Sequence, residues 1–106
     1  MKENDYPILM TEEYWRNSYL SIARHYGQIN FNGKIYMIVN KHGETMLEIS
    51  ERMDKEGKDG YAVPPGEPAD LVLMEWIPVY RRLGRERVME LIEENVSLKD
   101  AKKLNK

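Results

Sequence analysis

The fold is decided by the stretch Ile29-Asn30-Phe31-Asn32-Gly33-Lys34-Ile35-Tyr36. An Asn-Gly pair between strand-forming residues is the strongest short signal of a β-hairpin, because both central positions of the tight turn need positive φ. Asn32 and Gly33 therefore predict two antiparallel strands joined by a two-residue loop. In that register Phe31 lies opposite Lys34.

The second arm of this hairpin is apolar on both faces. Residues 35–39 read Ile-Tyr-Met-Ile-Val, without the polar alternation of a half-exposed strand. Such a strand is more stable inside a sheet than at its edge, so we expect it to be central and to gain a second neighbour. Two stretches qualify as that neighbour, Leu71 to Met74 and Tyr61 to Val63.

An amphipathic helix is predicted upstream of the hairpin, over residues 12–26. Thr11 is a suitable N-cap, Gly27 suits the left-handed stop, and apolar side chains recur at spacings of four, three and four residues. Arg16 lies on another side of the helix, one turn from Glu12. The apolar stripe that should face the core consists of Trp15, Tyr19, Ile22 and Tyr26.

A second helix is favoured over residues 45–56. Thr45, with Glu48 three residues later, has the pattern of a capping box, and the Glu, Arg and Lys residues downstream favour helix. The competing interpretation is another hairpin, because Thr45, Leu47 and Ile49 also alternate.

Glycine and proline dominate residues 57–70, which we therefore expect to form a loop with at most one short strand. Downstream, Gly84 breaks one helical stretch from the next, and Ser97 is a suitable N-cap for a terminal one. We expect three further helices, over residues 78–83, 85–95 and 98–104.

Together these elements predict a single α+β domain over residues 1–106. A small antiparallel sheet, made of the hairpin and one or two short strands, packs against the N-terminal helix and two or three C-terminal helices. A length of 106 residues suits one domain, and 42% hydrophobic residues suffice for one core. Residues 1–10 and 105–106 are expected to be irregular ends.

The composition excludes several classes of site. The chain has no Cys, which rules out disulfides, thiolate zinc sites, iron–sulfur clusters and a cysteine nucleophile. His25 and His42 are expected to be a helix cap and an exposed side chain rather than metal ligands. No phosphate-binding loop or catalytic motif is present, so we expect no catalytic residues, metal or cofactor. The apolar runs are far shorter than the roughly twenty residues of a membrane span. We expect a cytoplasmic protein.

Four arginines around the expected junction between two helices form the first candidate site: Arg81, Arg82, Arg85 and Arg87. Guanidinium groups suit phosphate or an acidic surface, which makes nucleic-acid binding an alternative function. The formal net charge of -2, however, lacks the strong positive field of a typical non-specific nucleic-acid binder. The preferred interpretation is that the arginines pair with acids on the same helix, namely Glu90, Glu93 and Glu94.

The second candidate site is a protein-contact surface. Tyr14 and Leu20 fall beside the apolar stripe of the first helix, and exposed side chains of this kind mark interfaces. Pro64, Pro65 and Pro68 pre-order an extended segment, which lowers the entropic cost of docking. The alternative, which is the preferred one for these prolines, is that they only stiffen the connection between the sheet and the C-terminal helices. We therefore expect a non-catalytic protein-interaction or accessory module that binds another protein or a second copy, as in a homodimer. A small enzyme without a recognisable motif is a further alternative.

Overall fold

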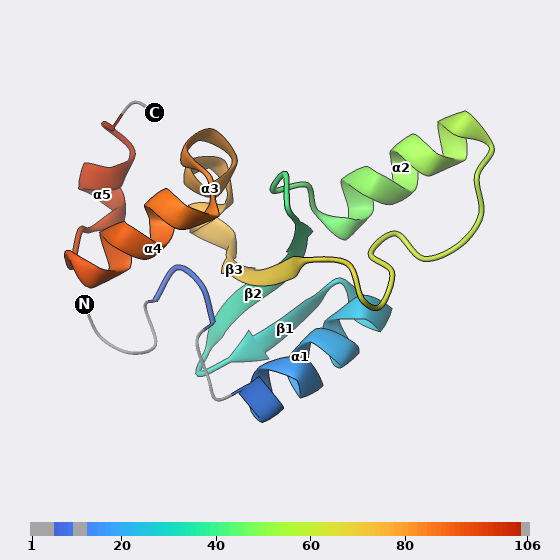
Figure 1. The fold of residues 1–106 in the computed structure, drawn as a ribbon, viewed down its shortest axis with the longest axis horizontal. Coiled ribbons are helices and arrows are strands. Elements are labelled where there is room, and N and C mark those ends of the chain that lie inside the picture. The colour runs from blue at the N-terminus through green and yellow to red at the C-terminus, as the bar shows by residue number, and fades with distance from the viewer. Residues whose placement is uncertain (1–5, 10–12, 105–106) are drawn as a thin grey trace.

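The computed structural model describes residues 6–9 and 13–104 and has the α+β architecture expected from the sequence (Figure 1). A three-stranded antiparallel sheet in the order β1-β2-β3 lies between the N-terminal helix α1 and the C-terminal helices. Helix α1 contacts all three strands, and α3 contacts β3. One hydrophobic cluster joins the strands to the helices.

The hairpin consists of β1 (Gln28–Phe31) and β2 (Lys34–Asn40) in the register that the sequence predicts. Asn32 has φ 51° and Gly33 has φ 79°, so both turn residues adopt the left-handed conformation. This is the geometry for which Asn-Gly is selected, because neither residue is strongly penalised at positive φ. The prediction of the hairpin is confirmed.

Strand β2 is central, as its two apolar faces indicated. Its second neighbour is β3 (Ala69–Leu73), which pairs antiparallel with it. Of the two candidate neighbours, the stretch at Leu71 is therefore the correct one. Residues 61–63 belong instead to the loop before β3, where the side chain of Val63 is buried and anchors the loop to the core.

The outer edge of β3 is covered by the N-terminal segment. The amide of Leu9 donates to the carbonyl of Leu71 at 2.9 Å, and the amide of Leu73 donates to the carbonyl of Pro7 at 2.7 Å. Residues 7–9 were expected to belong to an irregular end. That prediction was wrong for them, because they pair with β3. Because β3 lies deep in the core, its edge amides need protein partners in place of water.

Helix α1 (Glu13–Tyr26) turns toward the sheet a stripe that matches the predicted one only in part. Tyr19 packs against the core as expected, and the side chain of Trp15 lies outside the described part of the structure. Leu20 and Ala23 are buried, whereas Ile22 and Tyr26 are exposed. The prediction was wrong here because periodicity was read from the largest apolar side chains. The methyl group of Ala23 lets the helix lie close against the strands, and this close approach sets which face is inward.

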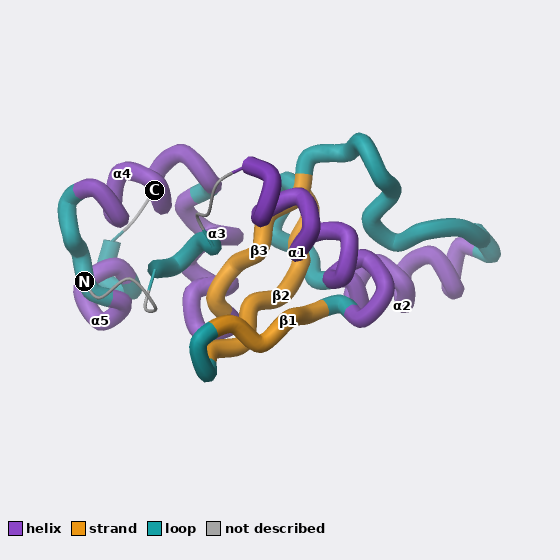
Figure 2. Tube along the Cα trace, turned by 90° about the horizontal axis from the view of Figure 1, so that it is seen from below, coloured by secondary structure: helices purple, strands orange, loops and turns teal. Residues whose placement is uncertain are grey.

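Helix α2 (Met46–Glu56) begins at the predicted capping box, in which the hydroxyl of Thr45 accepts from the amide of Glu48 and the Glu48 carboxylate accepts from the amide of Thr45. The helical interpretation of this segment is confirmed over the second hairpin. Ile49 is its buried contact with the core. Figures 1 and 2 both show that α2 and the returning loop project from one end of the sheet.

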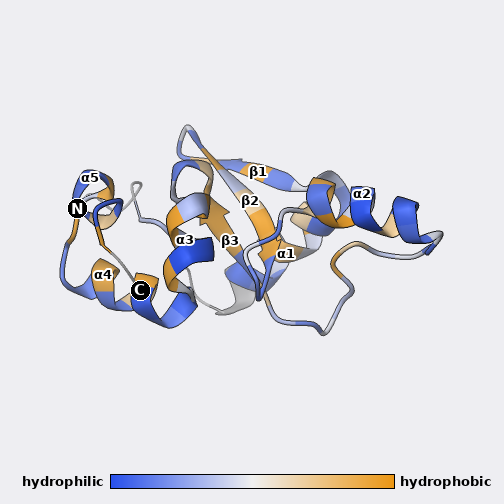
Figure 3. Cartoon of the chain, turned by 90° about the horizontal axis from the view of Figure 1, so that it is seen from above, coloured by the Kyte–Doolittle hydropathy of each residue, from blue (hydrophilic) through white to orange (hydrophobic). Residues whose placement is uncertain are grey.

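The C-terminal part is helical, as predicted, with shorter elements. It contains the 3₁₀ turn η2 (Met74–Trp76) and the helices α3 (Ile77–Leu83), α4 (Arg85–Glu93) and α5 (Leu98–Ala101). Gly84 separates α3 from α4 at φ 89°. Apolar residues concentrate on the strands and on the inner sides of these helices, whereas the projecting end of α2 is hydrophilic (Figure 3). None of the helices in the described ranges is long and apolar enough to cross a membrane.

Candidate functional site

A buried carboxylate at the start of β3 joins four elements of the fold. Asp70 is 3% exposed and accepts three side-chain hydrogen bonds. Its Oδ1 accepts from Nη2 of Arg16 on α1. Its Oδ2 accepts from the hydroxyl of Tyr80 on α3 at 2.7 Å and from Nε of Arg85 on α4 at 2.8 Å. We call these four residues the Asp70 cluster.

The Asp70 cluster compensates a charge that would otherwise be costly to bury. Removing a carboxylate from water costs several kcal/mol unless ion pairs and hydrogen bonds replace the lost hydration. Burial, together with the hydrogen bond to Asp70 and its negative charge, raises the pKa of the Tyr80 hydroxyl far above its ordinary value of 10. Tyr80 is therefore a proton-bearing donor at neutral pH and does not act as a base.

A cavity of about 280 Å³ opens beside this cluster. Its lining includes Arg16, Tyr80 and Arg85 and adds the ammonium-bearing side chain of Lys41, which follows β2. Of the side chains that the structure describes, three cationic ones and one carboxylate thus border a single cavity. The excess of positive charge makes this part of the surface suited to anions.

Neither Asp70 nor Lys41 was predicted from the sequence as a site residue. The only signal for Asp70 is its place directly before the apolar run Leu71-Val72-Leu73, where a carboxylate must be buried with the strand. Its partners are 54, 10 and 15 positions away along the chain, so no spacing rule brings them together. Arg16 forms an ion pair with Asp70. Glu12, the neighbour expected for Arg16, lies outside the described residues.

The four arginines of the first candidate site do not converge. Arg81 donates from Nε to the carbonyl of Gly43 at 2.8 Å and forms an ion pair with Glu48. Arg82 donates from Nη2 to the carbonyl of Ala101 at 3.2 Å and to that of the next residue, also at 3.2 Å. Both guanidiniums therefore tie α3 to other elements of the fold.

The remaining two arginines, both on α4, pair with different partners. Arg85 belongs to the Asp70 cluster. Arg87 pairs within its own helix, with Nη1 at 3.2 Å from Glu90 and 3.9 Å from Glu94. Pairing on the same helix, which the sequence favoured, thus describes Arg87 but not the other three arginines.

The residues of the predicted protein-contact surface differ in their exposure and do not form one surface. The side chain of Tyr14 lies outside the described part of the structure. Leu20 packs in the core, so it presents no contact surface on this fold. Pro65 and Pro68 are exposed on the loop and Pro64 is half-buried. Pro68 also borders the cavity at the Asp70 cluster.

A groove with exposed apolar walls lies where the end of α1, the start of β1 and the start of α2 meet. Its volume is about 290 Å³. Tyr26 is 77% exposed and Leu47 is 67% exposed, and both line this groove. We call it the Tyr26–Leu47 groove, and its lining consists mainly of Tyr26, Gly27, Gln28, Met37, Met46 and Leu47.

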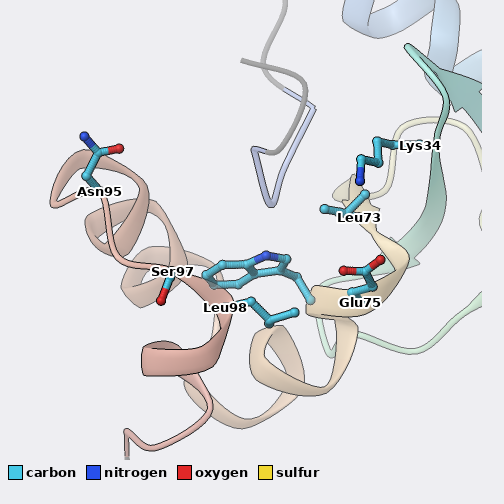
Figure 4. Close-up of a pocket in the computed structure, with 7 residues that line it drawn as sticks. Lys34, Leu73, Glu75, Asn95, Ser97 and Leu98 are labelled. Atoms are coloured by element: carbon cyan, nitrogen blue, oxygen red, sulfur yellow. The ribbon is translucent and has the colours of Figure 1, made fainter. Parts of the chain in front are cut away.

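A further cavity, of about 300 Å³, lies between η2, the end of β3 and the connection from α4 to α5 (Figure 4). Trp76 is one of its lining residues. Lys34 and Glu75 lie on one side of the cavity and Asn95 and Ser97 on the other. The two charged side chains carry opposite signs and lie on the same side. The cavity therefore has no excess charge that would select a ligand class.

The described residues contain no group of three or more His, Asp or Glu side chains placed to hold a metal ion. His25 and His42 lie on the exposed end of α1 and in the exposed turn after β2.

Comparison with protein-family models, with curated proteins and with solved structures gives no match to this chain. Its function is therefore inferred from its own residues.

Proposed function

We propose that the protein is a non-catalytic binding module that docks an extended segment of a protein partner along β1 and into the Tyr26–Leu47 groove. The observation that carries this proposal is that two large apolar side chains, 77% and 67% exposed, border the same groove beside an open sheet edge. Contiguous apolar surface of this kind is characteristic of interaction sites, since it gains free energy when a partner covers it.

The backbone of β1 supports an extended occupant. The amide of Ile38 donates to the carbonyl of Gly27 at 3.1 Å, so Gly27 faces β2. By the alternation of an antiparallel pair, the backbone groups of Gln28 and Asn30 point away from β2. No strand within the described ranges pairs with that side of β1. An added strand would satisfy these donors and acceptors, as in other recognition by strand addition.

The side chains around the groove support a protein ligand over a polar small molecule. Met37 and Met46 are unbranched and polarizable, so they adapt to an irregular apolar surface. Tyr26 combines an apolar ring with a polar hydroxyl, a combination that is enriched at protein interfaces. An extended segment with alternate apolar side chains would place these in the groove while its backbone pairs with β1.

The nucleic-acid alternative has weaker support, because three of the four arginines in its candidate site already hold other parts of the fold together. A small enzyme remains a further alternative, and the raised pKa of Tyr80 argues only against that residue as a general base.

Affinity capture from a lysate of the cells that express the protein tests the proposal when it is run on matched variants. The Tyr26→Ser, Leu47→Ser double variant removes the apolar walls of the groove. Tyr61→Ser is the control, because Tyr61 is a comparable exposed aromatic, 62% exposed, on the loop away from the groove.

We expect the wild type and Tyr61→Ser to retain the same nuclease-resistant proteins and the double variant to lose them. Retention of those proteins by the double variant would contradict the proposal. Loss of the bound material on nuclease treatment would instead favour nucleic-acid binding.

A further inference from the structure

We infer that the cavity at the Asp70 cluster is a second binding site, which takes the phosphate group of a small phosphomonoester. This inference rests on residues other than those of the Tyr26–Leu47 groove and is independent of the proposed protein partner. It begins with charge: Arg16, Lys41 and Arg85 border the cavity, and among the described residues Asp70 is the one carboxylate that borders it. The lining has two more positive than negative side chains, and a phosphomonoester carries about −1.5 to −2 at pH 7.

The hydrogen-bonding capacity of the two arginines points to a ligand as well. A guanidinium has five N–H donors. Arg85 uses its Nε for Asp70, and its terminal nitrogens have no partner among the described residues. Arg16 uses Nη2 for Asp70 and for the carbonyl of Ala69, while its Nε is buried without a partner. Donors remain on both side chains beyond those that Asp70 occupies.

Asp70 and Tyr80 hold this site in place before any ligand arrives. Asp70 accepts from Arg16 through one oxygen and from Arg85 through the other, so the two guanidiniums are fixed on either side of one carboxylate. Tyr80 donates to the same carboxylate at 2.7 Å and limits its rotation. Cations that are ordered in advance bind with a smaller loss of side-chain entropy.

The size of the cavity limits the ligand. Its volume of about 280 Å³ lies just below the range of about 300–1,000 Å³ for small-molecule sites. It accommodates one oxyanion with a small substituent. Guanidinium groups suit the paired oxygens of phosphate, and Lys41 adds a mobile point charge at the rim.

The test is a titration of the full chain with sodium phosphate, followed by the amide and arginine Nε–H resonances in ¹H–¹⁵N spectra. Sodium chloride and sodium acetate at matched ionic strength are the comparison titrations. Lys41→Gln is the main variant, because Lys41 is exposed and its replacement leaves the Asp70 cluster intact. Arg87→Gln is the matched control, because it removes one positive charge from α4 outside the cavity.

We expect saturable shifts at Arg16, Lys41 and Arg85 with phosphate, and a dissociation constant about tenfold higher in Lys41→Gln, from the loss of one close charge. Arg87→Gln should bind phosphate as the wild type does, and Tyr26→Ser should also leave this binding unchanged.

Three outcomes would overturn the inference. The first is a linear drift of many surface resonances without saturation. The second is an equal loss of affinity in Lys41→Gln and Arg87→Gln. The third is equal affinity for acetate and phosphate, because that result would remove the assignment to a phosphate group.

Discussion

Replacement of Asp70 by Asn tests whether the Asp70 cluster holds α1, β3, α3 and α4 together. Asn has nearly the shape of Asp and still accepts one hydrogen bond from Tyr80, but it carries no charge. The substitution removes the carboxylate with which Arg16 and Arg85 both form ion pairs. The change in stability on this substitution therefore measures the loss of the ion pairs and not a change in packing volume.

The expected loss in the free energy of unfolding follows from the burial of the Asp70, Arg16 and Arg85 side chains. Removing one partner of a buried ion pair costs about 3–5 kcal/mol. The Asp70 side chain is 4% exposed, but those of Arg16 and Arg85 are 28% and 45% exposed. Both guanidiniums can therefore recover part of their hydration, which places the expected loss at the lower end of this range, about 3 kcal/mol.

Urea denaturation measures this loss as a change in the free energy of unfolding at constant m-value. Glu93→Gln is the control, because Glu93 is an exposed carboxylate on α4, and we expect it to change stability by less than about 0.5 kcal/mol. A loss below about 1 kcal/mol in Asp70→Asn, the size of one ordinary neutral hydrogen bond, would refute the reasoning.

Two further predictions concern the segment around α2. Hydrogen bonds from the amide and hydroxyl of Thr45, with the charge of Arg81, hold the pKa of Glu48 below its ordinary 4.5. The contribution of the ionised Glu48 to stability is therefore present above about pH 4.5, and it is lost as pH falls through the lowered pKa. Urea titrations between about pH 3 and pH 7 should therefore show a smaller acid-induced loss in Glu48→Gln than in the wild type, and equal losses would contradict this. Gly43→Ala should cost about 1–3 kcal/mol more than Gly66→Ala, because a Cβ at Gly43 would lie 2.6 Å from Cγ of Arg81 whereas Gly66 faces open space at a similar positive φ. Thermal and urea unfolding of the two variants measure that difference. Equal losses of stability would show that the contact between a Cβ at Gly43 and the side chain of Arg81 does not destabilise the fold.

The local elements could be read from the sequence because each depends on neighbouring residues. Asn32 and Gly33 set the hairpin through their own tolerance of positive φ. Thr45 and Glu48 start α2 through hydrogen bonds across three positions. Turn and capping patterns of this kind span only a few neighbouring residues, so they can be recognised without knowledge of any tertiary contact.

The candidate site could not be read in the same way. Asp70 and Arg16 are far apart in the chain, and the face of α1 that carries Arg16 is chosen by how closely Ala23 approaches the sheet. The arginines around Gly84 were predicted as a group because they are adjacent in sequence. They separate in space because successive residues of a helix point in directions about 100° apart.

Amide hydrogen exchange at Gln28 and Asn30 is the most direct test of the central claim that β1 is a docking edge. In the isolated protein these outward amides should exchange rapidly, while those of the β2–β3 ladder are protected. With the captured partner bound, both amides should become protected. Unchanged exchange at Gln28 and Asn30 in the complex would contradict strand addition at β1.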